Sequence, residues 1–238
     1  MSIDRFILAS GSPRRKELLG QIGIVPEIMP SDIDEEITTT VPEDLVINLS
    51  RNKAMDIASK LQKHDCNDTH SMPSNMELTG YERDNKAYPI NNLSSSDDSE
   101  SKTHLQKRMT LILGADTVVS VDGHILGKPH SHEEAAEMIR SIQGRSHQVY
   151  TGVTIIARDD TGRDTFDSFA VKTDVNVYPM TEEEITAYAE SSEPMDKAGA
   201  YGIQGAFAKY IKGIEGDYNN VVGLPVAEVF QRIKHHIN

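Results

Sequence analysis

Apolar and polar positions along the chain follow two different periods, which predicts a mixture of strands and helices. Short apolar runs at 5–9 and 111–115 are typical of buried strands. Residues 42–61 place leucine, isoleucine and alanine on one face at helical spacing and predict a helix. Another helix is predicted at 13–21, because Ser12 offers an N-cap hydroxyl and a proline follows at the first helical position.

The second half of the chain predicts strands joined by tight turns, together with capped helices. Residues 118–121 and 124–126 flank Asp122-Gly123, a pair suited to a two-residue type I′ hairpin turn. Long strands at 149–157 and 166–178 should pair as neighbours across the turn between them. Helices are predicted after the capping pairs Ser131/Glu134 and Thr181/Glu184, and from 225 to 237.

A polar segment at 64–107 interrupts this pattern. Of its 44 residues 10 are hydrophobic, and it is rich in Asn, Ser and Asp. Such a segment cannot offset its ordering entropy by burial, so we expect a disordered insertion there. The rest of the chain predicts a single α/β domain over 1–238, built as a mixed twisted sheet flanked by helices.

Composition and charge narrow the classes of function. The chain has 24 Lys and Arg against 37 Asp and Glu, a formal net charge of -13, which opposes binding to duplex nucleic acid or to an anionic membrane. It has no run of 18 apolar residues and no signal-peptide pattern, and Cys66 is its one cysteine. We therefore expect a cytoplasmic protein without nucleic-acid or membrane partners.

A turn at residues 10–15, Ser-Gly-Ser-Pro-Arg-Arg, leads from the first strand into the first helix. Backbone N–H groups at a helix N-terminus point toward one place, and the guanidinium groups of Arg14 and Arg15 match phosphate oxygens. The turn therefore predicts an anion site. The alternative interpretation is a capped helix with solvated basic side chains. The segment matches neither a Walker A loop nor a Rossmann fingerprint.

Asp116 follows the apolar strand at 111–115, where a charged side chain would not contribute to packing. Open α/β folds place binding and catalytic groups at the C-terminal edge of the sheet, so Asp116 and Thr117 are candidates for a site. Lys128 follows the predicted hairpin and can return a cation toward them. The alternatives are an Asx turn for Asp116 and a surface charge for Lys128.

An acidic run at 32–36 includes Glu35. Carboxylate oxygens suit Mg²⁺ or Mn²⁺, which takes one or two protein carboxylates beside substrate phosphates. An acidic run in an acidic protein is also typical of a solvated loop, so a metal site here needs support from elsewhere.

A glycine-rich loop lies at 196–205, Asp-Lys-Ala-Gly-Ala-Tyr-Gly-Ile-Gln-Gly. Glycines this dense indicate close approach of the backbone to another segment or to a ligand. The later run at 213–225 ends in a turn that precedes the last helix, and we interpret it as mainly structural.

Several motifs agree in order and spacing with one known family. They lie at 10–15, 51–54, 114–119, 127–129, 151–153, 196–205 and 220–225. Together they resemble the Maf family of nucleoside triphosphate pyrophosphatases over nearly the whole folded chain, and the segment at 64–107 interrupts the match. The resemblance implies a fold related in architecture to the inosine triphosphatase group, with two lobes around a cleft, and a homodimer. It also implies a divalent cation and hydrolysis of a nucleoside triphosphate to the monophosphate and pyrophosphate.

The resemblance also implies roles for individual residues. Asp116 would accept the proton of the attacking water, directly or through the metal, and Glu35 would be the second metal ligand. Lys53 and Lys128 would take up the charge that builds on the departing pyrophosphate. The residues that would hold the triphosphate are Ser10, Ser12, Arg14 and Arg15.

Gln204 bears on the choice of base. Uracil and thymine present acceptor, donor and acceptor along one edge, which a glutamine amide can meet with both a donor and an acceptor. Arg14, Thr117 and Gln204 resemble the specificity positions of the Maf branch that acts on dTTP and UTP, so we expect pyrimidine triphosphates, modified ones included. One alternative is 7-methyl-GTP, the substrate of another branch. A second is a nucleotide-binding regulator of cell division and septum formation, which would need no proton acceptor such as Asp116.

Overall fold

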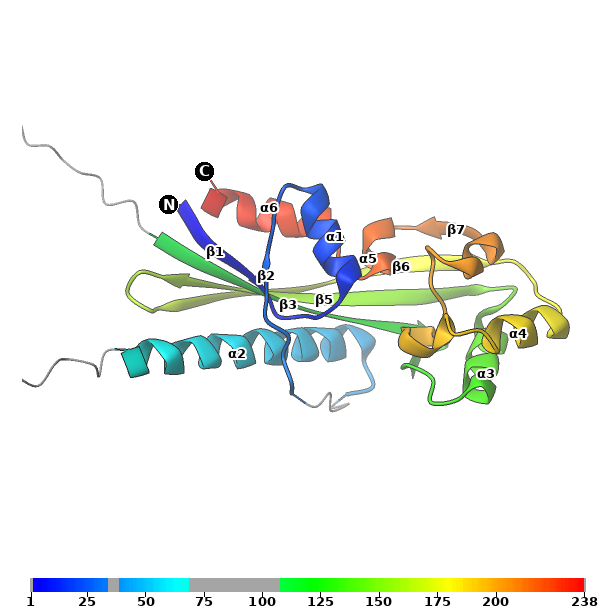
Figure 1. Ribbon diagram of the computed structural model, residues 1–238. Coiled ribbons are helices and arrows are strands. Elements are labelled where there is room, and N and C mark those ends of the chain that lie inside the picture. Colours follow the sequence, from blue (N-terminus) through cyan, green and yellow to red (C-terminus); the bar gives the residue numbers. More distant parts are fainter. Residues whose placement is uncertain (1, 34–38, 69–107, 238) are drawn as a thin grey trace, which may run out of the picture.

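A mixed β-sheet forms the centre of the molecule (Figure 1). The computed structural model describes residues 2–33, 39–68 and 108–237. The strands are β1 (Ser2–Leu8), β2 (Glu27–Ile28), β3 (Arg108–Val121), β4 (His124–Leu126), β5 (Ser146–Asp159), β6 (Asp164–Val177) and β7 (Ile211–Glu215). They follow the order β2-β1-β3-β5-β6-β7, and β4 pairs with β3. β1 runs parallel to β2 and β3, whereas β3, β5, β6 and β7 are antiparallel to their neighbours in that order.

Helices cover both faces of this sheet, as expected for a mixed α/β fold. They are α1 (Pro13–Gln21), α2 (Pro42–Asp68), α3 (His132–Ile142), α4 (Glu182–Ala189), α5 (Tyr218–Val222) and α6 (Val226–Ile237), with short 3₁₀ segments η1 (Pro194–Asp196), η2 (Ala198–Ala200) and η3 (Ala206–Tyr210). α2 lies along one face, and α1 and α6 lie on the other (Figure 1). Within the described ranges, no helix combines the length and the apolar composition needed to cross a lipid bilayer.

Side chains of the central strands alternate between the two faces. Ile7 of β1 and its register partner Ile112 of β3 belong to the apolar cluster packed against α2. Leu8 and Leu111 belong to the cluster that α1 and α6 cover. All four side chains are fully buried. Because both faces of these strands are covered, their sequence is a nearly continuous apolar run rather than an alternating one.

The long strands β3, β5 and β6 continue past the end of β1 into a second apolar core. There Val119, Val149 and Val175 pack with residues of α3, α4 and the 3₁₀ segments. The two cores at opposite ends of the same strands account for the two lobes that the family resemblance implies. The predicted mixed sheet with flanking helices is confirmed.

The position of Asp116 in β3 differs from the sequence prediction. The apolar run at 111–115 is the middle of a strand that continues to Val121, so Asp116 is not at its C-terminal end. β3 does not end at the charge because it stays paired with β5, where Asp116 lies opposite Gly152. The strand that ends here is β1, whose last pairing with β3 joins Leu8 to Leu113. Asp116 therefore lies at the open edge left by the carboxyl end of β1.

The predicted insertion begins inside α2. Residues 64–68 form the last turn of that helix, and residues 69–107 lie outside the described part of the chain. The helix ends and β3 begins at the same end of the sheet (Figure 1). From Arg108 to Asp116 an extended strand covers roughly 26 Å, so both attachment points are far from Asp116.

Candidate active site

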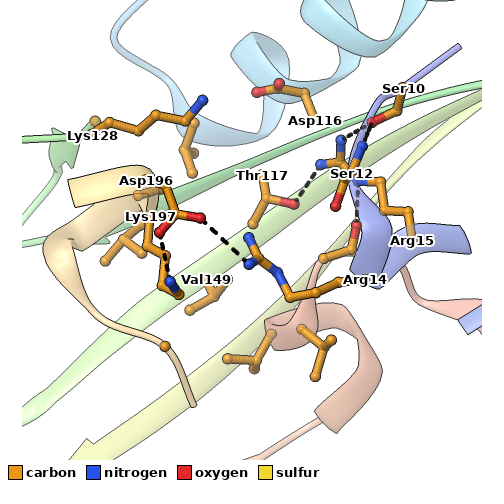
Figure 2. A pocket seen from close by; sticks show the side chains of 18 of the residues that line it. Ser10, Ser12, Arg14, Arg15, Asp116, Thr117, Lys128, Val149, Asp196 and Lys197 are labelled. Carbon is orange, nitrogen blue, oxygen red and sulfur yellow. Dashed lines mark hydrogen bonds and ion pairs between the residues drawn. The ribbon is translucent and has the colours of Figure 1, made fainter. Parts of the chain in front are cut away.

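A pocket of about 930 Å³ opens beside the carboxyl end of β1. Its walls come from segments that are far apart in the sequence: the turn before α1, the middle of α2, β3, the loop after β4, and the loop at 193–205 (Figure 2). Nine of the ten predicted site residues line it, namely Ser10, Ser12, Arg14, Arg15, Lys53, Asp116, Thr117, Lys128 and Gln204. The tenth, Glu35, lies outside the described residues.

Lys53 of α2 and Asp116 of β3 form an ion pair in this pocket. Lys53 Nζ lies 2.5 Å from Asp116 Oδ1, and the side chains are 12% and 10% exposed. A charged pair so far removed from water persists only with close geometry, because each group has lost most of its hydration. In Figure 2 the ammonium end of Lys128 extends toward Asp116 from the opposite wall. Cations from two elements therefore face the same carboxylate.

Two glycines allow α2 to lie close enough for this ion pair. A Cβ on Gly114 would overlap the carbonyl oxygen of Ser50, and a Cβ on Gly152 would overlap the carbonyl of Val46. Ser50 Oγ is also hydrogen-bonded to Thr154 Oγ1 of β5 at 3.0 Å. Glycine is required at both positions because any side chain would collide with α2, and its absence lets the backbone of α2 pack directly on the sheet.

Arg15 joins three walls of the pocket. Its Nε donates to the carbonyl oxygen of Gly223 at 2.8 Å, and its Nη1 and Nη2 donate to Ser10 Oγ and Thr117 Oγ1, each at 3.1 Å. The planar fork of a guanidinium suits such a three-way junction. Arg15 therefore links the walls of the pocket, and its predicted contact with phosphate stays a prediction.

The turn before α1 departs from the sequence prediction in another way. In the described structure the hydroxyl of Ser12 makes no capping hydrogen bond to the helix. Its backbone N–H instead donates to Ser10 Oγ at 3.3 Å. Ser10 Oγ thus accepts from both the turn and Arg15, which fixes the shape of the segment that precedes the helix.

Arg14 makes a looser contact than Arg15. Its Nη1 lies 3.8 Å from Asp196 Oδ2, and the two side chains are 36% and 66% exposed, so the pair is weak (Figure 2). Asp196 also accepts a 2.6 Å hydrogen bond from Lys197 Nζ. That bond, with a smaller contribution from Arg14, lowers the pKa of Asp196. An anionic ligand with denser charge can replace Asp196 as the partner of Arg14.

A chain of hydroxyls continues from Arg15 into the protein. Thr151 Oγ1 donates to the backbone carbonyl of Asn220 at 2.9 Å, so it accepts from Thr117 Oγ1, which lies 2.9 Å away. Thr117 in turn accepts from Arg15. Because each hydroxyl in this row donates to the next group, the direction of every hydrogen bond is determined. The interpretation of 213–225 as structural agrees with the use of the Asn220 and Gly223 carbonyls as acceptors here.

Comparison with known proteins gives the same family as the sequence motifs. A family model described as "Maf-like protein" matches residues 5–236. The chain belongs to the Maf family. It is 44% identical over 232 residues to a dTTP/UTP pyrophosphatase of Agathobacter rectalis, covering 98% of this chain and 97% of that protein. It is 39% identical to a protein of the same name from Lachnoclostridium phytofermentans and 37% identical to one from Bacillus cereus, each covering 97% of this chain and 94% of the relative.

Sequence reasoning missed three charged side chains of this Maf pocket. Glu193, Asp196 and Lys197 also line it, whereas the sequence singled out the loop at 196–205 only for its glycines and Gln204. The adjacent Asp196 and Lys197, the first two residues of the loop, could have indicated charged side chains in the pocket. Glu193 stands before the motif, and its role depends on contacts that no local pattern reveals.

The donor set of the Maf pocket fits a hard divalent cation. Among the described residues, no three His, Cys, Asp or Glu side chains are grouped so that they could hold a metal ion by themselves. Mg²⁺ seldom needs such a cage, because it keeps several waters and takes one or two protein carboxylates beside substrate phosphates. The buried carboxylate of Asp116 meets that requirement.

Proposed function

We propose that this Maf protein hydrolyses dTTP and UTP to the monophosphate and pyrophosphate. The observation that carries the proposal is the Lys53–Asp116 pair, at 2.5 Å, inside a pocket whose other walls carry Arg14 and Lys128. The printed name of the relatives, dTTP/UTP pyrophosphatase, supports the same reaction.

The reaction requires a water molecule in line with the bond that breaks. A new bond forms between the water oxygen and the α-phosphorus, the bond from that phosphorus to the bridging oxygen breaks, and pyrophosphate leaves. Asp116 orients this water and takes its proton. Lys53 fixes the orientation of the Asp116 carboxylate, which is what a proton acceptor in a buried position needs.

Positive charge from separate walls stabilises the phosphates. Arg14 exchanges its weak contact with Asp196 for phosphate oxygens, and Lys128 neutralises charge on the departing pyrophosphate. Ser10, Ser12 and the backbone of their turn complete the phosphate cradle at the start of α1. Arg15 supports this cradle from behind through Ser10 and Gly223.

A divalent cation, Mg²⁺ or Mn²⁺, would be held by Asp116 together with Glu35, and when bound it would supply further neutralisation of the phosphate charge. Removal of divalent ions with EDTA should abolish pyrophosphate release, and re-addition of Mg²⁺ or Mn²⁺ should restore it. Activity that persists in EDTA would contradict the metal requirement.

Gln204 selects the base by pairing with the acceptor and donor edge of uracil or thymine. Arg14 and Thr117 line the same pocket. The Thr117 hydroxyl is hydrogen-bonded to Arg15 and Thr151, so Thr117 acts through its position. A panel of nucleotides tests this choice. UTP and dTTP should give the highest kcat/KM, and fastest hydrolysis of 7-methyl-GTP would contradict it.

The identity of the released phosphate tests the proposed reaction itself. With UTP and Mg²⁺, pyrophosphate and UMP should appear in equal amounts. Release of orthophosphate would indicate a different hydrolase, and binding of UTP without either product would indicate a nucleotide sensor.

The oligomeric state, partners and cellular location of the enzyme are also part of the proposal. Resemblance to the Maf family supports a homodimer, and the net charge of -13 supports the absence of nucleic-acid and membrane partners. A cytoplasmic location agrees with a nucleotide substrate. Light scattering coupled to gel filtration should give twice the chain mass, and a monomer at micromolar concentration would contradict the homodimer.

A further inference from the structure

The loop that carries Gln204 is tied to Glu193. One carboxylate oxygen of Glu193, Oε1, accepts a 3.0 Å hydrogen bond from the hydroxyl of Tyr188, and the other, Oε2, accepts a 2.8 Å bond from the backbone N–H of Ala206. Its backbone carbonyl accepts a 2.8 Å bond from Lys197 Nζ. Glu193 therefore contacts the loop near both of its ends.

Tyr188 extends this attachment to the other side of Gln204. Its hydroxyl oxygen accepts a 3.4 Å hydrogen bond from the backbone N–H of Gly202 while its proton goes to Glu193. Burial, followed by the hydrogen bond to Glu193, raises the pKa of Tyr188, so the phenol keeps the proton that it donates. Gly202 and Ala206 bracket Gln204, and both are held by the Tyr188–Glu193 pair.

The glycines of the loop fit closely around the same groups. A Cβ on Gly205 would overlap the carboxylate of Glu193, and a Cβ on Gly202 would overlap the side chain of Lys197. Beneath the loop, Tyr201 and Tyr188 pack against the buried ring of Phe207, with ring centroids 4.9 and 5.0 Å away. The backbone around Gln204 is therefore set by polar bonds on one side and by aromatic packing on the other.

We propose that Glu193 is a positioning residue for base recognition: by holding Tyr188 and the Ala206 N–H, it sets the backbone on which Gln204 meets the pyrimidine. This role rests on the proposed function. The two carboxylate oxygens are engaged by the protein, so Glu193 acts through the loop. Without it, Gln204 remains present but samples positions that no longer discriminate between bases.

The test compares Glu193→Ala, Glu193→Gln and Tyr188→Phe with the wild-type protein. The matched control is Glu190→Ala, which removes an exposed carboxylate at the end of α4, outside the pocket. For each protein, kcat and KM are measured with UTP and with CTP, whose base edge differs from uracil. Amide hydrogen exchange is measured over residues 199–210, and folding is checked by thermal unfolding.

In Glu193→Ala we expect the UTP-to-CTP ratio of kcat/KM to fall about tenfold, mainly through a higher KM for UTP. Exchange at Gly202 and Ala206 should rise. Tyr188→Phe, which keeps the ring, should change both readouts in the same direction. Glu193→Gln should recover part of the selectivity, because its amide can still accept from Ala206 N–H. Glu190→Ala should match wild type.

A folded Glu193→Ala or Tyr188→Phe protein with wild-type base selectivity would overturn the proposal, even if kcat falls. If Glu193→Ala does not fold, Tyr188→Phe and Glu193→Gln decide the question. Failure of the proposed function has a different signature: the wild-type protein then releases no pyrophosphate from UTP. In that case the role in base recognition fails with the proposed function, and faster exchange at Gly202 and Ala206 in the variants would show only that Glu193 orders the loop.

Discussion

Gly114 of β3 faces the backbone carbonyl oxygen of Ser50 in α2 at a separation that leaves no room for a side chain on β3. Lys53 stands one turn further along the same helix and pairs with Asp116, two residues beyond Gly114 on the strand. The packing of α2 on the sheet and the geometry of the ion pair are therefore coupled.

Gly114→Ala should move α2 away from β3 and separate Lys53 from Asp116. We expect a loss of about 2 kcal/mol in the free energy of unfolding, together with a lower kcat. The control is Gly20→Ala, because a Cβ there would meet no described atom within 4 Å; it should leave stability unchanged or slightly raised. A Gly114→Ala protein with wild-type stability and kcat would contradict the coupling.

Arg14 and Arg15 should respond differently to replacement by lysine. Arg15→Lys loses the fork that joins Gly223, Ser10 and Thr117, so both the melting temperature should fall and the KM for UTP should rise. Arg14→Lys should raise KM without a change in melting temperature, because its pair with Asp196 is exposed. Equal melting temperatures for the two variants would show that Arg15 does not hold the pocket walls.

His147 predicts a specific dependence of stability on pH. Its Nε2 lies 2.8 Å from the Tyr201 hydroxyl, and burial lowers its pKa from 6.5 to about 4. Below pH 6.5 His147 is protonated in the unfolded chain, but in the folded protein it stays neutral until about pH 4. Protonation of the unfolded chain therefore lowers the free energy of unfolding progressively as the pH falls from 6.5 toward 4, and has no effect on it above pH 6.5. The total loss amounts to a few kcal/mol at most.

Urea unfolding at several pH values between 4.5 and 7.5 measures this dependence. His147→Gln keeps a hydrogen-bonding group near Tyr201 but cannot titrate, so its stability should fall less steeply with acid than that of the wild type. Carboxylates that do not interact with His147 cancel in the difference, and Asp174 is the one that couples to it. Parallel curves for the two proteins would refute the assignment to His147.

Much of the fold could be predicted from local sequence, because the relevant signals are local. The Asp122-Gly123 turn has φ values of 51° and 78° and joins Val121 to His124 as predicted. The capping box of Thr181 and Glu184 is present at α4. Both depend on residues adjacent in the chain, so spacing alone indicates them.

The site could be predicted only in part, because its geometry depends on contacts between distant segments. Motifs indicated Asp116 as a site residue, but its position at the edge left by β1 depends on where a different strand ends. The hydrogen bond from Arg15 to the Gly223 carbonyl joins residues that are 208 positions apart in sequence. No local pattern indicates which of the two neighbouring arginines makes these hydrogen bonds across the pocket.

Deletion of residues 69–107 should leave turnover intact. The attachment points, at the end of α2 and the start of β3, lie at the same end of the sheet (Figure 1). The pocket-lining residues Lys53 and Asp116 lie 15 and 8 residues from these points along α2 and β3. A short Gly/Ser linker in place of the segment should give kcat and KM for UTP close to those of the full chain. A folded deletion variant with a large loss of kcat would show that the segment contributes to the site.

The most direct test of the proposed chemistry is the rate of pyrophosphate release from UTP by Asp116→Asn compared with the wild type. Asparagine keeps the shape of the side chain and can still contact Lys53, but it cannot take a proton from water. The rate should fall by about 10²–10⁴-fold, in a protein that still folds and binds UTP but melts at a lower temperature, because Lys53 loses its charged partner. Near-normal pyrophosphate release by Asp116→Asn would contradict the assignment of Asp116 as the proton acceptor.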